Sequence, residues 1–356
     1  MAASVAIRLA KRGIACIVNS QRSARVIRQK HKSYLRTARS SNLVATNAGA
    51  GGVKYRLQMM SPGESMSQSS SDQSQRFLFL DADVRGEIVR LNRSYTDTVS
   101  NHAYPPAVSA LLGEFLAAAA LLGSTIKYEG RLVLQVRGNG ELSLIMSECT
   151  SDGAVRGIAR YQQVPRHSDF DALTGDGVLV MTVDSTRSEP YQGIVSLEGG
   201  SLAASLKTYF EQSEQLQTWF YFAVNEEQAC GFMLQQLPAA RQPNADERTA
   251  SWEHLLVLAQ TITATELHSL DNEALLHRLY HQEQVQLFAP RDFYYRCSCS
   301  RERTARALVS IGREEVESIV AEHGAVNIAC EFCGTDYRFE ADEVKLLLQD
   351  RGDHVH

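Results

Sequence analysis

The sequence lacks any long uninterrupted hydrophobic run, and it contains only seven cysteines in 356 residues. Its most apolar stretch, residues 107–123, is short for a membrane-spanning helix and carries Glu114. We therefore expect a buried core helix there and no membrane partner. Seven cysteines are too few for the disulfide framework of a secreted protein of this length, which indicates a reducing compartment and favours the cytoplasm.

Acidic residues are absent from the first 62 positions, which carry twelve Lys or Arg. Residues 63–356 then hold 24 basic and 41 acidic side chains, a balance of −17. A body of this charge repels nucleic acid and membrane surfaces, so we expect no nucleic-acid partner.

Residues 1–75 differ in composition from the rest and end in the low-complexity stretch MSPGESMSQSSSDQSQ. We predict a disordered basic extension that takes no part in the fold. Its Arg-rich, Ser-rich and acid-poor composition is also that of a transit peptide, which would place the protein in the mitochondrial matrix. We favour a start codon assigned too early, with the true start at Met59, Met60 or Met66.

Residues 76–237 alternate short apolar strands with helical segments. The first strand-like stretch contains Gly86, which we expect at a bulge or bend. A Gly-Asn-Gly turn at residues 138–140 predicts a hairpin. An apolar helix is expected over residues 107–122, and a second helix is expected to be capped by Ser201. Because regular βαβ alternation is missing, we predict a mixed α+β core domain.

Residues 238–290 read as a helical and polar linker, which begins at Pro238. Thr263 and Glu266 have the spacing of a capping box. The apolar stripes of these helices are narrow and the helices are short, so they need a neighbour to remain folded. The linker is therefore interpreted as a set of marginal helices.

Four of the seven cysteines form two tight pairs in the last predicted module, residues 291–350. Cys297 pairs with Cys299, and Cys330 with Cys333. Four thiolates at this spacing favour one bound Zn²⁺, because zinc takes four sulfur ligands in a tetrahedron. Two helices are expected between the pairs, and a strand, a knuckle and a strand around the second pair. The other three cysteines are far apart and are interpreted as free thiols; they are Cys16, Cys149 and Cys230.

Such a zinc site can be static, serving only to stabilise a small module. However, Cys-x-Cys is unusual in a zinc ribbon, and each pair is close enough in sequence to form a disulfide within itself. Zinc-bound sulfur is thiolate, the form that oxidants attack. Structural zinc contributes about 10–16 kcal/mol to folding a small site, so losing it should unfold this module.

The cysteine pattern is also compatible with two other functions. A structural zinc ribbon that binds nucleic acid predicts a basic face, which the balance of −17 disfavours. A thiol oxidoreductase that uses Cys330 and Cys333 needs a low-pKa thiol at a helix N-terminus, where we expect strands instead. No triad pattern indicates hydrolysis, so we do not expect an enzyme.

CSCSRER followed at a distance by CEFCG resembles the zinc-centre motif of the heat-shock protein 33 family, the redox-regulated bacterial chaperones. YQGIVSLEG, SEQL, GFMLQQLP and RLYHQEQV are similar to that family's core and linker signatures, in the same order. The resemblance covers about residues 76–350. The N-terminal extension departs from the family, which puts the start and the compartment in doubt and leaves the chemistry unaffected.

The resemblance implies a holdase that consumes no nucleotide and is inactive while its four C-terminal cysteines hold zinc. Oxidation would pair Cys297 with Cys299 and Cys330 with Cys333, release the metal and unfold the linker at residues 238–290. The exposed surface would bind unfolded client proteins. The active form would be a homodimer that passes its clients to an ATP-dependent foldase.

Overall fold

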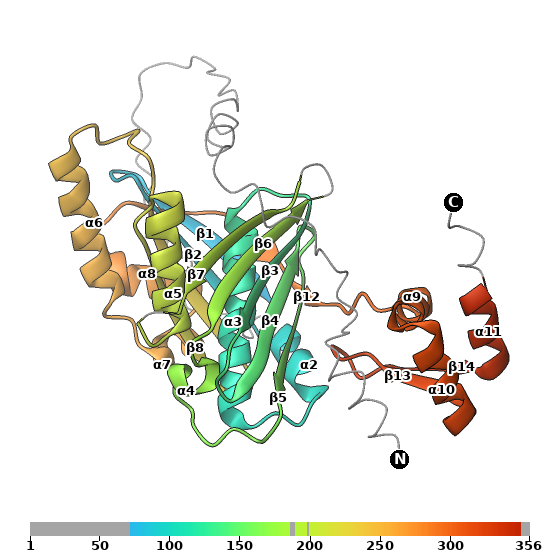
Figure 1. The fold of residues 1–356 in the computed structure, drawn as a ribbon. Coiled ribbons are helices and arrows are strands. Elements are labelled where there is room, and N and C mark those ends of the chain that lie inside the picture. The colour runs from blue at the N-terminus through green and yellow to red at the C-terminus, as the bar shows by residue number, and fades with distance from the viewer. Residues whose placement is uncertain (1–71, 186–188, 198, 350–356) are drawn as a thin grey trace, which may run out of the picture.

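The computed structural model describes residues 72–185, 189–197 and 199–349 (Figure 1). The predicted basic extension lies outside the described residues up to position 71, and Cys16 lies there with it. The described chain forms two sheets, a central helix, a layer of three helices and a small C-terminal module (Figure 1). The predicted α+β fold is confirmed.

The first sheet has the strand order β10-β1-β2-β9-β8, and β11 also pairs with β1. All of its pairs are antiparallel. Strand β1 begins before residue 76, the predicted start of the core domain, because Gln73 and Ser74 pair with both β2 and β11. The strands are β1 (Gln73–Phe79), β2 (Val84–Leu91), β8 (Thr218–Val224), β9 (Ala229–Gln236), β10 (Val285–Leu287) and β11 (Arg291–Asp292).

The second sheet has the order β12-β5-β4-β3-β6-β7 and is antiparallel except where β12 meets β5. The hairpin predicted around residues 138–140 is confirmed by the pairing of β3 with β4. The strands are β3 (Gly130–Arg137), β4 (Leu142–Thr150), β5 (Ala154–Tyr161), β6 (Val178–Ser185), β7 (Tyr191–Ser196) and β12 (Tyr294–Tyr295).

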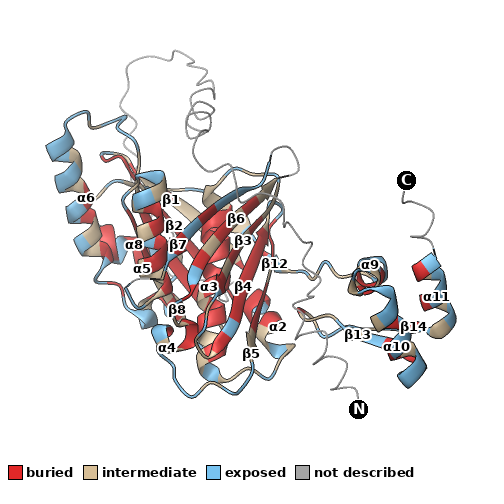
Figure 2. Ribbon diagram, in the orientation of Figure 1, coloured by how far each residue is buried: buried red, intermediate tan, exposed pale blue. Residues whose placement is uncertain are grey.

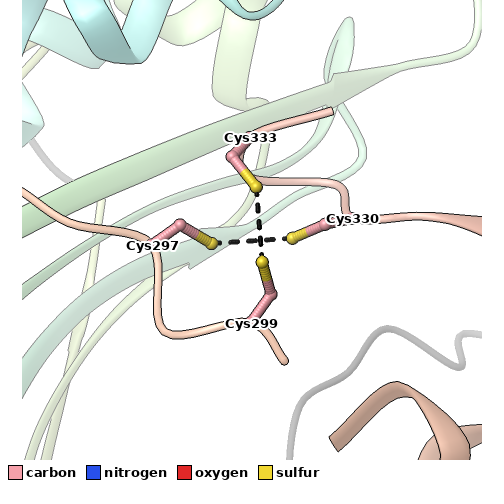
Figure 3. A group of neighbouring side chains, drawn as sticks. All are labelled: Cys297, Cys299, Cys330 and Cys333. Carbon is pink, nitrogen blue, oxygen red and sulfur yellow. Dashed lines mark hydrogen bonds between the residues drawn. The ribbon is translucent and has the colours of Figure 1, made fainter. Parts of the chain in front are cut away.

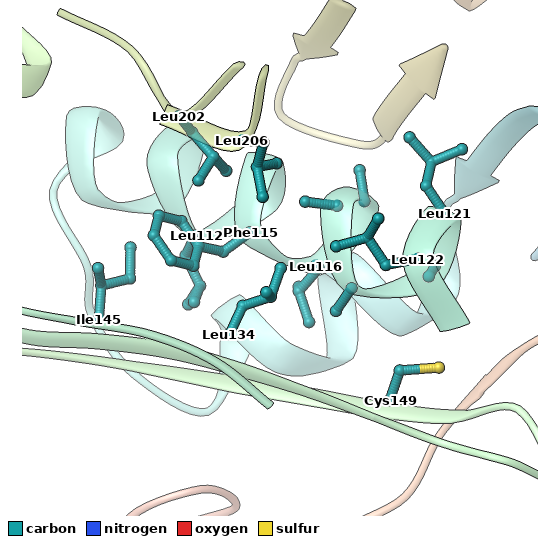
Figure 4. Close-up of a cluster of buried hydrophobic side chains, with 14 of the residues drawn as sticks. Leu112, Phe115, Leu116, Leu121, Leu122, Leu134, Ile145, Cys149, Leu202 and Leu206 are labelled. Carbon is teal, nitrogen blue, oxygen red and sulfur yellow. The ribbon is translucent and has the colours of Figure 1, made fainter. Parts of the chain in front are cut away.

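Helix α3 (Pro106–Thr125) packs against both sheets and forms the centre of the core (Figure 4). Residues 117–120 are four fully buried alanines, whose small side chains let the sheets approach the helix closely. With 20 residues α3 is longer than predicted, and it is long and apolar enough to cross a membrane. However, 72% of its apolar window is buried inside the structure, so α3 is the core helix that the sequence predicts.

The other helices that pack around the two sheets between β2 and β8 are short. Ser201 caps α5 by accepting a hydrogen bond from the N–H of Ala204, as predicted. Helix α2 is not predicted by the sequence, because its cap comes from far away: the Asp72 carboxylate accepts hydrogen bonds from three N–H groups of residues 92–94. These elements are α2 (Arg93–Ser100), α4 (Phe170–Thr174), α5 (Leu202–Tyr209) and the π-helical turn η2 (Phe210–Glu214).

Gly86 does not lie at a bulge or bend, and that prediction is wrong. It pairs in regular register with Phe77 of β1 and Leu234 of β9. The ring of Phe77 lies across this position, where a Cβ would come 1.9 Å from the ring's Cζ. Glycine is therefore required here by side-chain packing.

Three helices cover the face of the first sheet that is turned away from α3 (Figure 1). They are α6 (Ala245–Ala259), α7 (Ala264–Ser269) and α8 (Asn272–Tyr280). The capping box of Thr263 and Glu266 is present at the start of α7, as predicted. The apolar stripes share one cluster with Phe77 and Phe232 of the sheet. These helices thus have the neighbour that their length requires.

The C-terminal module has a small core of its own. Figure 2 shows that buried residues dominate the two sheets and α3 and are sparse in this module. Gly312 and Gly324 end its first two helices with φ of 109° and 74°, as expected. The elements are α9 (Arg301–Ile311), α10 (Arg313–His323), β13 (Ala325–Ala329), β14 (Asp336–Glu340) and α11 (Ala341–Gln349).

Candidate metal centre

Cys297 and Cys299 lie on the extended segment between β12 and α9. Strand β12 holds the start of this segment against β5, and the N–H of Arg296 donates to the carbonyl of Val155 at 3.3 Å. The side chain of Ser300 caps α9 and fixes the other end. The first cysteine pair is therefore held between a core strand and a helix start.

Cys330 and Cys333 lie in the turn that joins β13 to β14. The N–H of Cys330 donates to the carbonyl of Thr335, and the N–H of Gly334 donates to the carbonyl of Cys330, both at 2.8 Å. Gly334 has a φ of 68°, a left-handed conformation that glycine adopts without steric cost. These bonds form the knuckle that sequence spacing predicts.

The four cysteine side chains point toward one common centre (Figure 3). All four Sγ atoms lie within 4.8 Å of one another. The Sγ atoms of Cys299 and Cys333 are 3.4 Å apart, and those of Cys297 and Cys330 are 3.6 Å apart. All four residues are half-buried. The fold thus brings together the four predicted residues, and this group could hold a metal ion.

Three polar side chains contact the sulfurs. Arg156 of β5 donates to the Sγ of Cys297 at 3.6 Å, and the hydroxyl of Tyr337 on β14 donates to the Sγ of Cys299 at 3.0 Å. The hydroxyl of Thr335 lies 3.2 Å from the Sγ of Cys333. Donors around a sulfur ligand stabilise its thiolate form and orient it.

The close approach of the thiols shifts the pKa values of Cys297 and Cys330 in opposite directions. Hydrogen bonding from Cys330 lowers the pKa of Cys297, and the same contact raises the pKa of Cys330. Burial raises the pKa of Cys299, although the Tyr337 hydroxyl opposes this shift. The contact between Cys297 and Cys330 therefore favours the thiolate on Cys297 and the thiol on Cys330.

The knuckle is docked on the second sheet through Phe332, the residue just before Cys333. Its ring packs against an apolar cluster on β4 and β5. The guanidinium of Arg156 stacks on the ring at 3.9 Å from its centroid and pairs with Glu148 at 2.6 Å. Arg160 of β5 forms an ion pair with Glu331. The cysteine cluster is thus joined to the core by apolar, stacking and charged contacts.

Sequence reasoning did not find Arg156 or Tyr337. Arg156 lies 141 residues before Cys297, and no local pattern links the two. Tyr337 lies on the strand directly after the knuckle, so its proximity to the sulfurs could have been inferred from the predicted hairpin.

Cys149 and Cys230 are buried free thiols, as expected. Burial raises the pKa of Cys149 to about 11 and that of Cys230 to about 12. Because the thiolate is the reactive form, both are poor nucleophiles while the chain is folded.

Comparison with known proteins identifies relatives across most of the chain. The family model described as "Hsp33 protein" matches residues 72–340. The 33 kDa chaperonin of Pseudomonas aeruginosa (strain LESB58) is 51% identical over 287 residues, which cover 80% of this chain and 97% of that protein. The 33 kDa chaperonin of Azotobacter vinelandii is 50% identical with the same coverage.

Among solved structures, the crystal structure of the 33 kDa chaperonin (heat shock protein 33 homolog) from Thermotoga maritima has the same fold. Its TM-score to this chain is 0.68, and the match covers 79% of this chain and 99% of that one. The two sequences are 24% identical.

Proposed function

Because the chain belongs to the Hsp33 family, which is a family of chaperones and not of enzymes, we propose that it is a redox-regulated, ATP-independent holdase. The proposed switch is a zinc centre formed by Cys297, Cys299, Cys330 and Cys333. In the reduced, zinc-bound form the protein is inactive. Oxidation releases the metal and lets the protein bind unfolded clients.

The convergence of four thiols is the observation that carries this proposal. A tetrahedral zinc site with bonds of about 2.3 Å separates neighbouring sulfurs by roughly 3.8 Å. The Sγ separations of 3.4 Å and 3.6 Å are close to this value. An all-sulfur donor set also suits zinc better than magnesium or calcium, which prefer oxygen. Zinc, when bound, would hold the sulfurs as thiolates and cross-link the two segments.

We propose that oxidation forms the disulfides Cys297–Cys299 and Cys330–Cys333. Formation of each disulfide transfers two electrons and two protons from a thiol pair to an oxidant such as peroxide or hypochlorite, which is reduced to water or to chloride and water. Disulfides within the pairs leave the two cysteine segments unlinked, whereas a disulfide between the pairs would keep them tied. Only the first outcome frees the knuckle from the segment that leads into the core.

Release of the knuckle is proposed to destabilise the linker at residues 238–290. The end of the linker and the chain that leads from it to Cys297 are held by three strands of only three, two and two residues, namely β10, β11 and β12. The hydroxyl of Tyr295 on β12 donates to the carbonyl of Phe332 in the knuckle at 3.3 Å. Without the metal these short pairings lose their anchor, and α6–α8 lose support at their C-terminal end.

We further propose that the active form is a homodimer in the cytoplasm and that it passes clients to an ATP-dependent foldase. The relatives named above are bacterial proteins. The balance of −17 disfavours a nucleic-acid ribbon. Cys330 and Cys333 lie in a hairpin turn and not at a helix N-terminus, which disfavours a thiol oxidoreductase.

The test measures zinc release and client protection on the same sample. Reduced, metal-bound protein is treated with hypochlorite, or with peroxide at raised temperature, and zinc is followed with a chromogenic chelator. A thermally unfolding client is then added and its light scattering recorded. The switch predicts zinc release, reduced scattering, and reversal of both by reductant with zinc. Zinc that stays bound, or that leaves with no gain in protection, would show a static site.

A further inference from the structure

The outer face of the second sheet carries an apolar surface that is half covered. Along β4, Ile145 and Cys149 face α3, whereas Leu144 and Met146 point to the opposite side. When side chains alternate between the two faces of an antiparallel sheet in this way, one face is commonly exposed to solvent. Here both sets are buried, because the knuckle of the metal centre lies over the outer one.

Phe332 is the side chain that covers this patch. Its ring packs against Leu144, Met146 and Ile158, which are 5%, 3% and 3% exposed, and Phe332 itself is 8% exposed. Phe332 stands on the turn that joins β13 to β14, and the guanidinium of Arg156 stacks on its ring. The patch thus already holds the kind of group it would bind: an aromatic side chain presented by an irregular segment.

A row of side chains that is apolar except for Gln135 continues from the knuckle toward the edge of the sheet. Met146 pairs with Ile158 on one side and with Gln135 on the other, Gln135 pairs with Val180, and Val180 pairs with Ile194. These positions form one row across the outer face. Ile194 on the edge strand β7 is 56% exposed. The row therefore begins under the knuckle and ends in an open apolar side chain.

A metal held by the four cysteines would keep Phe332 over the covered half. Phe332 lies between Cys330 and Cys333, so two of the four proposed ligands fix its direction. Arg160 pairs with Glu331 in the same turn and holds it against β5. Loss of the metal would release the turn and expose the patch to solvent.

We propose that this row on the outer face of the second sheet binds aromatic and aliphatic side chains of an extended, unfolded polypeptide, and that Phe332 occupies the site while the metal centre is intact. The release step rests on the proposed function. The surface is separate from the face of the first sheet that α6–α8 cover. The knuckle acts as an internal competitor for the client.

Three variants test this surface. Phe332→Ala uncovers the patch without removing a metal ligand. Ile194→Thr removes the open apolar end and keeps a β-branched residue on the strand. Gln192→Thr is the matched control, because it lies on the same strand and face in a polar row with Thr182. The probe is a fluorescein-labelled, permanently unfolded peptide rich in Phe and Leu, whose binding is followed by anisotropy. Zinc content is measured for every sample.

Reduced, fully metal-bound Phe332→Ala should bind the peptide about tenfold more tightly than the reduced wild type, and Ile194→Thr should weaken the oxidised protein about threefold. Gln192→Thr should change neither affinity.

The inference is overturned if metal-bound Phe332→Ala binds no better than wild type, or if oxidised Ile194→Thr matches the control. If Phe332→Ala loses its metal, the Ile194→Thr comparison decides. If oxidised wild type keeps its zinc, the proposed function fails, and the reduced Phe332→Ala sample still tests the surface.

Discussion

The guanidinium of Arg156 lies 3.6 Å from the Sγ of Cys297 and 3.9 Å from the ring centroid of Phe332. One core side chain therefore contacts both segments that form the cysteine cluster. Its charge is balanced by Glu148, and both side chains are about nine-tenths buried. The second sheet thus contributes directly to the stability of the cysteine cluster.

Replacing Arg156 by Met should weaken this docking. The change leaves Glu148 largely buried with only the longer contact to Arg131, at 3.8 Å, so the free energy of unfolding should fall by about 2–3 kcal/mol. Oxidant should also release zinc faster. Thermal unfolding and the chelator assay measure the two effects. Arg131→Met is the control, since that side chain is 38% exposed and should cost under about 1 kcal/mol. Equal effects from both variants would contradict a specific role for Arg156.

The hydroxyl of Tyr337 is expected to protect Cys299 from oxidation. It donates to the Sγ of Cys299 at 3.0 Å and withdraws charge from that sulfur. Tyr337→Phe should therefore speed zinc release by about threefold at fixed peroxide concentration. Tyr294→Phe is the matched control, because the hydroxyl of Tyr294 donates to Asp152, away from the sulfurs. Unchanged release from Tyr337→Phe would show that this bond has no part in the reactivity.

Gly86→Ala should destabilise the first sheet together with the helices that cover it. The new Cβ would push the ring of Phe77 toward Tyr280 of α8, whose ring centroid is 6.3 Å away. We expect a loss of about 2–3 kcal/mol in the free energy of unfolding and activation at lower oxidant. Denaturant unfolding and client scattering measure these effects. Adding Phe77→Leu should recover part of the loss, and strictly additive losses would rule out the clash as the cause.

Glu114 on α3 should make stability depend on pH. Burial raises its pKa from 4.5 to about 7. Between these values the native state keeps a proton that the unfolded state has released, so the free energy of unfolding falls as the pH rises. Glu114→Gln should remove this fall and be more stable than wild type at pH 8, by on the order of 2 kcal/mol. The two proteins should converge at pH 4. Parallel stability curves across this range would contradict the assignment.

Local signals in the sequence predicted much of the fold and all four cysteines of the site. Several of these signals act on residues within a few positions, so their effect can be predicted from spacing. They are the cap by Ser201, the capping box of Thr263 and the glycines that end α9 and α10. The cysteine pairs have the same property. Candidate ligands that come in close pairs can be identified from their spacing before any fold is known.

Contacts between distant segments could not be predicted in this way. The cap of α2 comes from Asp72, and the docking of the knuckle depends on Arg156. Strands β11 and β12 have two residues each and exist only because a partner strand is present. A glycine inside a strand, such as Gly86, indicates a position where a side chain is not tolerated. Only the tertiary structure identifies the Phe77 ring as the reason.

The position of the four-cysteine module near the end of the sequence also matters while the protein is being made. Strands β1 to β9 precede all four of its cysteines, and β10, β11 and β12 follow only after the helices α6, α7 and α8. Domains emerge from the ribosome and fold in order from the N-terminus. Each newly made molecule therefore completes most of both sheets before Phe332 has been synthesised. For that interval the outer face of the second sheet has no cover, whatever the redox state of the cell.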